Sequence, residues 1–372
     1  MSLRSEFPIF EHSRYLNTCS LGTLARRSRA RIDAYLDTWE ARGAAAWYDD
    51  WWAALAELRR RYGQWIGAPG ETVALHPNIS SAIGVVAGAL DYSTRPKVVV
   101  TDLDFPTVAY QWLAREAGGV EVEVVTSEDS VTIPLEKLMD AIDDRTALVA
   151  TSHVFFTTGA ILDVGAVARH AHARGALVLI DGYQAVGQIP VDVAASGVDF
   201  YVGGGLKWLL GGPGIAFLYV SPEHHASLVP SVTGWFAHRD QFAFDPLTLE
   251  FHDDARRFET GTPAMASVFC QLGGLDVLEE VGPDRVRAIT RDLTRDLVTE
   301  ARVTGLEPRL TTDPDDHSAI VVIPRTDPAA DVARLGREGI VIDARPGHVR
   351  ISPYFYNVRD DHRAAIEALT SD

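Results

Sequence analysis

Residues 176–207 read ALVLIDGYQAVGQIPVDVAASGVDFYVGGGLK, and this stretch decides the fold. It holds two short apolar runs, Ala176–Ile180 and Phe200–Val202, each followed by polar or glycine-rich residues. Continuous apolar runs are typical of strands that are buried on both faces, as in a mainly parallel sheet under helices. Because ligands bind beyond the carboxyl ends of such strands, Asp181 and Lys207 are predicted to lie at the ligand-binding edge.

The alternation of strand and helix continues on both sides of this stretch. We expect further strands at 97–101, 120–125, 147–151 and 215–220, and helices at 25–40, 49–66, 106–116, 135–142 and 164–174. After about residue 265 the pattern changes to long helical stretches mixed with short strands. The sequence therefore predicts an α/β protein with a large domain over residues 1–265 and a smaller α+β domain over residues 266–372.

Composition and charge exclude several classes of protein. The 372 residues include 51 Asp+Glu against 34 Lys+Arg, a formal charge of −17 that disfavours nucleic acid and anionic membranes as partners. No apolar run reaches the roughly 18 residues of a membrane span. The two cysteines, Cys19 and Cys270, make neither a disulfide framework nor a zinc set. We expect a cytoplasmic protein without a metal ion.

Lys207 and Asp181 carry the chemistry that this edge predicts. Lys207 stands in a glycine-rich loop between Leu206 and Trp208, so it is partly desolvated. Desolvation lowers the pKa of a lysine and makes its amine a nucleophile toward an aldehyde. An acid such as Asp181 could hold a protonated pyridine nitrogen. The two residues fit a pyridoxal 5′-phosphate (PLP) site, and the alternatives are a surface lysine after a turn and an aspartate that caps a helix.

Three other features fit the same kind of site. The segment Asn78–Ser81 opens an apolar helix, where free N–H groups and hydroxyls would suit a phosphate or form a plain N-cap. Phe105 follows the strand at 97–101, so its ring can reach the same edge. Arg350 lies in an apolar strand and needs an anion, which is either a substrate carboxylate or a structural ion pair.

These residues resemble the class V aminotransferase-like branch of the fold-type I PLP enzymes, over nearly the whole chain. The likeness to kynureninase rests on Tyr15–Gly22 (YLNTCSLG), Trp39, Trp47 and Asp104–Thr107 (DFPT). The likeness to cysteine desulfurases and isopenicillin N epimerase-like members rests on Ser152–Val154, Arg257–Pro263 (RFETGTP) and Arg350–Asn357 (RISPYFYN). The resemblance implies a fold-type I transferase with a mainly parallel seven-stranded sheet and a smaller C-terminal α+β domain.

The resemblance also implies roles for individual residues. Lys207 would bind PLP covalently and move the proton at Cα, Asp181 would pair with the pyridine nitrogen, and Arg350 would bind the carboxylate of an amino-acid substrate. The other implied cofactor contacts are Phe105 on the ring, Gln184 near the ring oxygen, His153, and Asn78, Ser80, Ser81 and Thr262 at the phosphate. Because Thr262 would reach the phosphate of a neighbouring subunit, a homodimer with shared active sites is expected.

The sequence departs from the family pattern in two places. Family members usually have Ser, His or Tyr just before the lysine, where this chain has Gly204, Gly205 and Leu206, so one or two phosphate ligands are missing or replaced. The segment 324–349 has no cysteine, which argues against a desulfurase that forms a persulfide. We expect Cys19 to be a buried, inert thiol, although its segment could face the site.

The predicted function is a PLP-dependent lyase that deprotonates an L-amino acid at Cα. It would then cleave Cβ–S in a cysteine conjugate or Cβ–C as in kynureninase. An aminotransferase, an epimerase, a decarboxylating deaminase and a non-catalytic PLP-fold binding protein stay open as alternatives. Candidates for the pocket lining are Trp208, Trp235, Phe236 and His238, for which core packing is the alternative.

Overall fold

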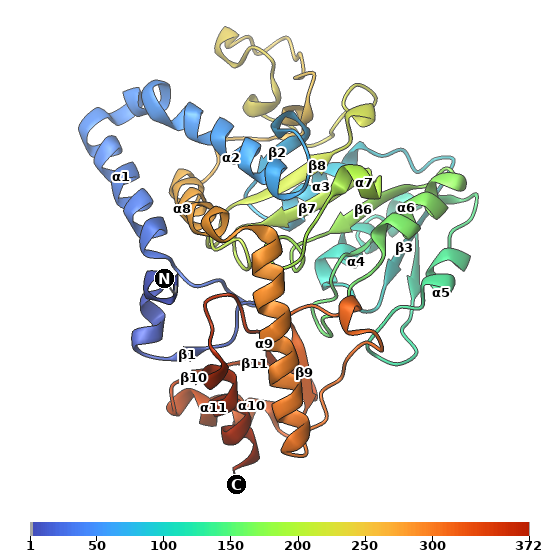
Figure 1. Cartoon of the computed structure of the whole chain (residues 1–372). Helices are drawn as coiled ribbons and strands as arrows, with labels where there is room; N and C mark the ends of the chain where they lie inside the picture. The colour runs from blue at the N-terminus through green and yellow to red at the C-terminus, as the bar shows by residue number, and fades with distance from the viewer. Residues whose placement is uncertain (1–2, 372) are drawn as a thin grey trace.

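The computed structural model describes residues 3–371, and its centre is a seven-stranded sheet of order β2-β8-β7-β6-β5-β3-β4 (Figure 1). The strands are β2 (Val73–His76), β3 (Lys97–Thr101), β4 (Glu121–Val125), β5 (Thr146–Ser152), β6 (Leu177–Asp181), β7 (Phe200–Gly204) and β8 (Ala216–Val220). Strand β8 runs antiparallel to both of its neighbours, and the other pairs are parallel. The expected mainly parallel sheet is therefore confirmed, although the sequence pattern missed β2, which has four residues.

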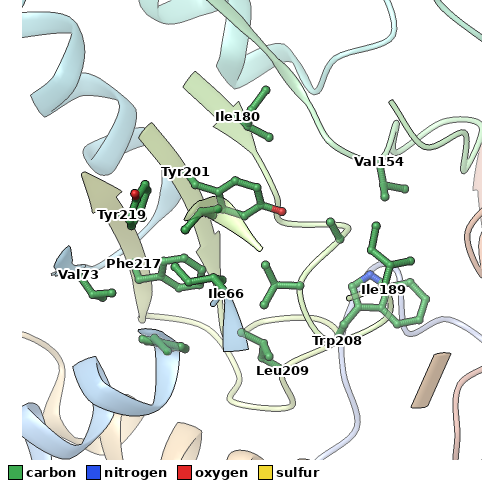
Figure 2. Close-up of a cluster of buried hydrophobic side chains, with 14 of the residues drawn as sticks. Ile66, Val73, Val154, Ile180, Ile189, Tyr201, Trp208, Leu209, Phe217 and Tyr219 are labelled. Carbon is green, nitrogen blue, oxygen red and sulfur yellow. The ribbon is translucent and has the colours of Figure 1, made fainter. Parts of the chain in front are cut away.

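Helices cover both faces of this sheet, because successive strand residues point to opposite sides. One face packs against α3 (Ile79–Ala89) and α4 (Pro106–Leu113) through residues such as Val98 and Val100. The other face, to which Val99 points, packs against α2 (Trp52–Trp65), α5 (Leu135–Asp140), α6 (Val164–Ala173) and α8 (Met265–Val281). Figure 2 shows part of this second layer, where Tyr201, Phe217 and Tyr219 lie on the sheet. The core thus fixes the strand ends that carry the predicted site.

The N-terminal helices form one corner of the molecule. Helix α1 (Arg26–Arg42) lies beside α8 (Figure 1) and is tied to it by the ion pair of Arg31 with Asp276 at 3.0 Å. A single π-helical turn, Trp47–Trp51, then leads into α2, so the second helix begins a few residues later than the sequence predicts. Trp51 is buried in this corner whereas Tyr48 is exposed, which leaves part of the aromatic cluster on the surface.

The C-terminal part contains long helices around a small antiparallel sheet of order β11-β12-β9. Its elements are α9 (Pro283–Val303), β9 (Val321–Pro324), α10 (Pro328–Arg337), β10 (Ile340–Val341), β11 (Asp343–Arg345), β12 (His348–Ile351) and α11 (Arg359–Thr370). Strand β1 (Arg14–Tyr15) pairs with β10, so the N-terminal segment packs against the C-terminal part (Figure 1). The division into two domains between residues 265 and 266 stays a prediction. Residues 1–2 and 372, at the outer ends of the two predicted domains, lie outside the described chain. The pairing of residues 14–15 with β10 links the first predicted domain to the second.

The helices are also informative about membranes. Within residues 3–371, none of them combines the length and the apolar composition that a membrane span requires.

Candidate active site

A cavity of about 370 Å³ opens at the carboxyl ends of β5, β6 and β7. Seven of the predicted site residues line it: Asn78, Ser80, Phe105, Asp181, Gln184, Lys207 and Arg350. A volume of this size is typical of small-molecule sites. The fold therefore brings together residues that are up to 272 positions apart in the sequence, from Asn78 to Arg350.

Lys207 follows strand β7 after two residues, and its ammonium group lies 4.8 Å from the centre of the Tyr183 ring. Burial lowers the pKa of Lys207 to about 8, an effect that Cys19 and Asp181 oppose and that the nearby arginines increase. A substantial share of this amine is then neutral near physiological pH, unlike that of an exposed lysine. The amine can therefore act as a nucleophile and as a base.

Asp181 is the last residue of β6, and it is 6% exposed. Its carboxylate accepts a hydrogen bond from the backbone N–H of Tyr183 at 2.9 Å, and within residues 3–371 it forms no ion pair. Burial raises the pKa of Asp181. A buried carboxylate with spare acceptor capacity favours a cationic N–H donor in the cavity, which is what a protonated pyridine nitrogen would supply.

The first turn of α3 forms another wall of the cavity. Asn78 caps this helix, because its side chain accepts a hydrogen bond from the backbone N–H of Ser81 at 2.9 Å. Ser80 lines the cavity with Thr107, and their hydroxyl oxygens are 3.4 Å apart. The Ser81 hydroxyl donates instead to the backbone oxygen of Asn78 and does not line the cavity. This wall can thus offer the N–H groups of the α3 N-terminus and the hydroxyls of Ser80 and of Thr107 in α4 to a phosphate.

Close packing accounts for a glycine near Lys207. A Cβ atom on Gly205 would lie 2.2 Å from Oε1 of Gln271. The Gln271 side chain is buried and held at both ends, by the Tyr62 hydroxyl and by the backbone oxygen of Leu209, so it has little room to move. A serine or histidine at position 205 would therefore not fit here, which explains why this chain lacks the usual residue.

Other predicted residues have different surroundings. Gln184 lines the cavity, but its amide donates to the backbone oxygen of Cys19 at 2.9 Å and accepts from the Trp208 indole at 2.8 Å. Phe105 is 45% exposed and meets Phe156 edge-on, with 5.1 Å between ring centres. An exposed ring at the cavity wall is free to cover a planar ligand.

Besides Ser81, two more of the predicted cofactor contacts, His153 and Thr262, do not line the cavity. His153 contacts the Tyr201 hydroxyl through Nδ1 at 2.9 Å, and burial lowers its pKa to about 4. Thr262 is exposed in the loop before α8. The proposed pocket-lining role of Trp208, Trp235, Phe236 and His238 is wrong for this cavity: Trp208 and Phe236 are buried in the core, and the other two line a separate surface pocket.

Arg350 shows one of the two alternatives that the sequence left open, the structural ion pair. It is 1% exposed, donates to the backbone oxygen of Phe156 at 2.6 Å and to the Ser20 hydroxyl at 2.9 Å, and forms an ion pair with Asp343. Its Nε has no partner among the described residues, although the side chain lines the cavity. A structural ion pair is present, and donor capacity is left for a ligand.

Comparison with known proteins now decides the family. The model of the class-V aminotransferases matches residues 30–366. The chain belongs to this family. The uncharacterized aminotransferase YcbU of Bacillus subtilis is 33% identical over 99% of this chain and 96% of its own. A probable cysteine desulfurase of Methanothermobacter thermautotrophicus is 30% identical over 85% of this chain and 82% of its own.

Further relatives agree with the expected branch of class V. They include kynureninases of Bacillus cereus and Deinococcus radiodurans, 27% and 33% identical, and the isopenicillin N epimerase of Streptomyces clavuligerus, 30% identical. The Bacillus cereus kynureninase matches over 98% of this chain and 90% of its own, and the Deinococcus radiodurans kynureninase over 78% and 72%. The isopenicillin N epimerase matches over 96% of this chain and 95% of its own. The solved complex of the cystine C-S lyase C-DES with cysteine persulfide shares the fold, with a TM-score of 0.91 at 20% identity, over 98% of this chain and 99% of that one.

The expected fold-type I architecture and family are therefore confirmed. Class V enzymes use PLP, and the residues present fit this cofactor. Asp181 forms no direct ion pair in residues 3–371, Lys207 is desolvated, and the first turn of α3 offers phosphate donors.

Several residues of the cavity were not expected from the sequence. These are Cys19, Ser20, Thr107, Phe156, Tyr183 and Arg345, with Asp343 behind them. Cys19 is fully buried as expected, yet it lines the cavity. The kynureninase-like segment Tyr15–Gly22 was a signal for Cys19 and Ser20, and Thr107 belongs to the quoted DFPT motif.

Potential metal ligands also occur outside the cavity. Asp199, Glu223 and His224 have ligand atoms within 4.8 Å of one another. The Asp199 carboxylate is already occupied by His172, His224 and the backbone N–H of Val178. The absence of a metal ion stays a prediction.

Proposed function

We propose that this chain is a PLP-dependent lyase that deprotonates an L-amino acid at Cα and then releases a group from Cβ. One observation carries the proposal: the amine of Lys207, with its pKa lowered to about 8 by burial, shares a cavity with Asp181 and Arg350. A base, a carboxylate for a pyridine nitrogen and a cation for the substrate carboxylate are the parts that this chemistry needs.

Each side chain has a separate task. When bound, PLP supplies an acceptor for the electron pair of the broken Cα–H bond. Asp181 holds the proton on the ring nitrogen, and Phe105 covers the ring and excludes water. Arg350 binds the α-carboxylate and so orients the substrate, which places Cα–H toward Lys207. The Nζ atom of Lys207 then takes the Cα proton.

Elimination at Cβ is the outcome that we favour. The likeness to a cystine C-S lyase supports it, as does the apolar wall formed by Phe105, Val154 and Phe156, which suits a thioether. With S-ethyl-L-cysteine and water, the reaction would give ethanethiol, pyruvate and ammonium. Kynureninase-like cleavage of Cβ–C is the other form of the same proposal.

The test combines a spectrum with a product assay. We expect the purified protein to have a visible absorbance band that borohydride bleaches and that Lys207→Ala lacks. S-ethyl-L-cysteine should yield pyruvate and ethanethiol when no keto-acid acceptor is added, and the Lys207→Ala variant should yield neither product. Product formed only with a keto-acid acceptor would make the protein an aminotransferase, and a colourless protein that ignores added PLP would be a non-catalytic relative.

A homodimer is part of the proposal. Exposed apolar side chains gather in the segment 229–249, where Phe244 is 72% exposed and Leu247 is 93% exposed, and Tyr48 faces the same region through Phe242. Exposed patches of this kind are typical of interfaces. Thr262 of a second copy would complete the phosphate site. Light scattering should give twice the chain mass, and Thr262→Ala should weaken PLP binding in the dimer.

A further inference from the structure

Two arginines line one end of the cavity and one aspartate lies behind them, all on a single β-hairpin. Strands β11 and β12 are joined by Pro346 and Gly347, and Gly347 has φ of 80°, which suits a tight turn. Asp343 stands directly opposite Arg350 across the hairpin. Arg345 is two residues after Asp343 and lines the cavity with Arg350.

Both carboxylate oxygens of Asp343 are engaged. One forms the ion pair with Arg350 and accepts from the Ser20 hydroxyl at 2.9 Å. The other accepts from Nη1 of Arg345 at 2.8 Å and from the backbone N–H of Ala344 at 2.9 Å. Four donors hold this carboxylate in place, so it is a fixed charge behind the cavity end.

The charges of Asp343, Arg345 and Arg350 at this end of the cavity are not balanced, and one more anion would neutralise them. Burial alone would raise the pKa of Asp343, but Arg350, the Ser20 hydrogen bond and Arg345 hold it below its usual value, so the group is ionised at neutral pH. Two guanidinium groups against one carboxylate leave one positive charge. One substrate carboxylate balances this charge, and the guanidinium group of Arg350, whose side chain lines the cavity, can donate to it.

We propose that Asp343 and Arg345 make this cavity selective for amino acids that carry a single carboxylate and an uncharged side chain. The inference rests on the proposed function, in which Arg350 binds the α-carboxylate. Asp343 determines the specificity, because its fixed negative charge lies behind Arg345 and Arg350 and would repel a second carboxylate. Arg345 is a positioning residue that keeps Asp343 from cancelling the charge of Arg350. The apolar side chain of Phe156 offers no partner to a charged substituent.

The opposite role for Arg345, as the receptor of a second carboxylate, fits the contacts less well. Its Nη1 already donates to Asp343 and to the backbone oxygen of Ala344 at 2.7 Å. A dicarboxylate near it would also lie near Asp343. Like charges about 6 Å apart at an effective dielectric of about 20 repel enough to weaken binding roughly 10- to 100-fold.

The test measures the binding of two carboxylates that lack an amino group. Propanoate and butanedioate are titrated calorimetrically into the PLP-loaded protein. We expect the wild type to bind propanoate at least about 10-fold more tightly than butanedioate. In Asp343→Asn, this ratio of the two affinities should be smaller by about 10-fold or more. The matched control is Asp331→Asn, because Asp331 also lies between two arginines, but these, Arg325 and Arg334, do not line the cavity. Its ratio should equal that of the wild type.

A second variant keeps the proposal testable if Asp343→Asn fails to fold. Arg345→Gln removes the surplus charge and should weaken propanoate binding about 10-fold. Equal or tighter binding of butanedioate by the wild type would overturn the proposal, as would an unchanged ratio in Asp343→Asn. The same titrations on the protein without PLP separate this inference from the proposed function, since the contacts of Asp343 do not involve the cofactor. If the visible absorbance band of bound PLP were missing, only the proposed function would be refuted.

Discussion

Replacing Lys207 by methionine should stabilise the protein without PLP. Desolvation lowers the pKa of the Lys207 ammonium from 10.5 to about 8, so the folded chain binds this proton less tightly than the unfolded chain does. Unfolding then takes up a proton between these two values, and stability rises with pH across that window. Below pH 8 the protonated lysine destabilises the folded state to its full extent.

The size of the effect follows from the difference of about 2.5 pH units. At about 1.36 kcal/mol for each pH unit, the cost approaches roughly 3.4 kcal/mol at pH 6. A chain of 372 residues has an unfolding entropy of roughly 0.8 kcal/mol/K, so this free energy corresponds to about 4 °C in Tm. Because Lys207 is only half-buried in the free cavity, an increase of about 2 to 4 °C is expected for Lys207→Met.

Differential scanning calorimetry of the protein without PLP, at pH 6 and at pH 10, provides the measurement. The Tm of Lys207→Met should exceed that of the wild type at pH 6, and the difference should fall to roughly a quarter at pH 10, where the lysine of the unfolded chain is still mostly protonated. Lys137→Met is the matched control, since Lys137 lies at the surface beside Glu128 and should show no such dependence. A variant that melts below the wild type at pH 6, or an equal difference at both pH values, would refute the reasoning.

Three other substitutions test the site. Gly22→Ala places a Cβ 2.0 Å from the backbone oxygen of Lys207, so it should lower the free energy of unfolding by about 3 kcal/mol and lower the PLP occupancy measured by absorbance. The control Gly118→Ala, whose Cβ meets nothing within 4 Å, should change neither quantity. Arg350→Lys should weaken propanoate binding about 30-fold by calorimetry, because the planar donors are lost. Asp181→Asn should slow the exchange of the Cα proton with D₂O, followed by NMR, by about 100-fold.

The sequence could predict the centre of the site because that centre depends on local patterns. Asp181 and Lys207 follow apolar strands, and the carboxyl ends of parallel strands meet at one edge whatever the loops do. Asn78 was placed in the same way, since an N-cap before an apolar helix is visible in a few residues. These predictions needed no knowledge of contacts between distant segments.

The walls supplied by the N-terminal segment could not be predicted in this way. Cys19 and Ser20 reach the cavity because β1 pairs with β10 over only two residues, more than 320 positions away in the chain. A pairing so short has no periodicity that a sequence pattern could reveal. The Gln184 amide shows the same limit, because its partner, the backbone oxygen of Cys19, arrives from that distant segment.

Arg350 shows how one missed turn concealed an electrostatic feature of the site. The sequence indicated short strands at 340–342 and 349–351, whereas the hairpin of the structure runs from β11 to β12 and turns at Pro346 and Gly347. Counting back from that turn places Asp343 opposite Arg350 and Arg345 beside both. Arg350 can then form a structural ion pair and still offer a positive charge to a substrate, because the second arginine, Arg345, also pairs with Asp343 and leaves a net charge of +1 on the hairpin. The charge of this hairpin, and not that of Arg350 alone, is what a substrate carboxylate would meet.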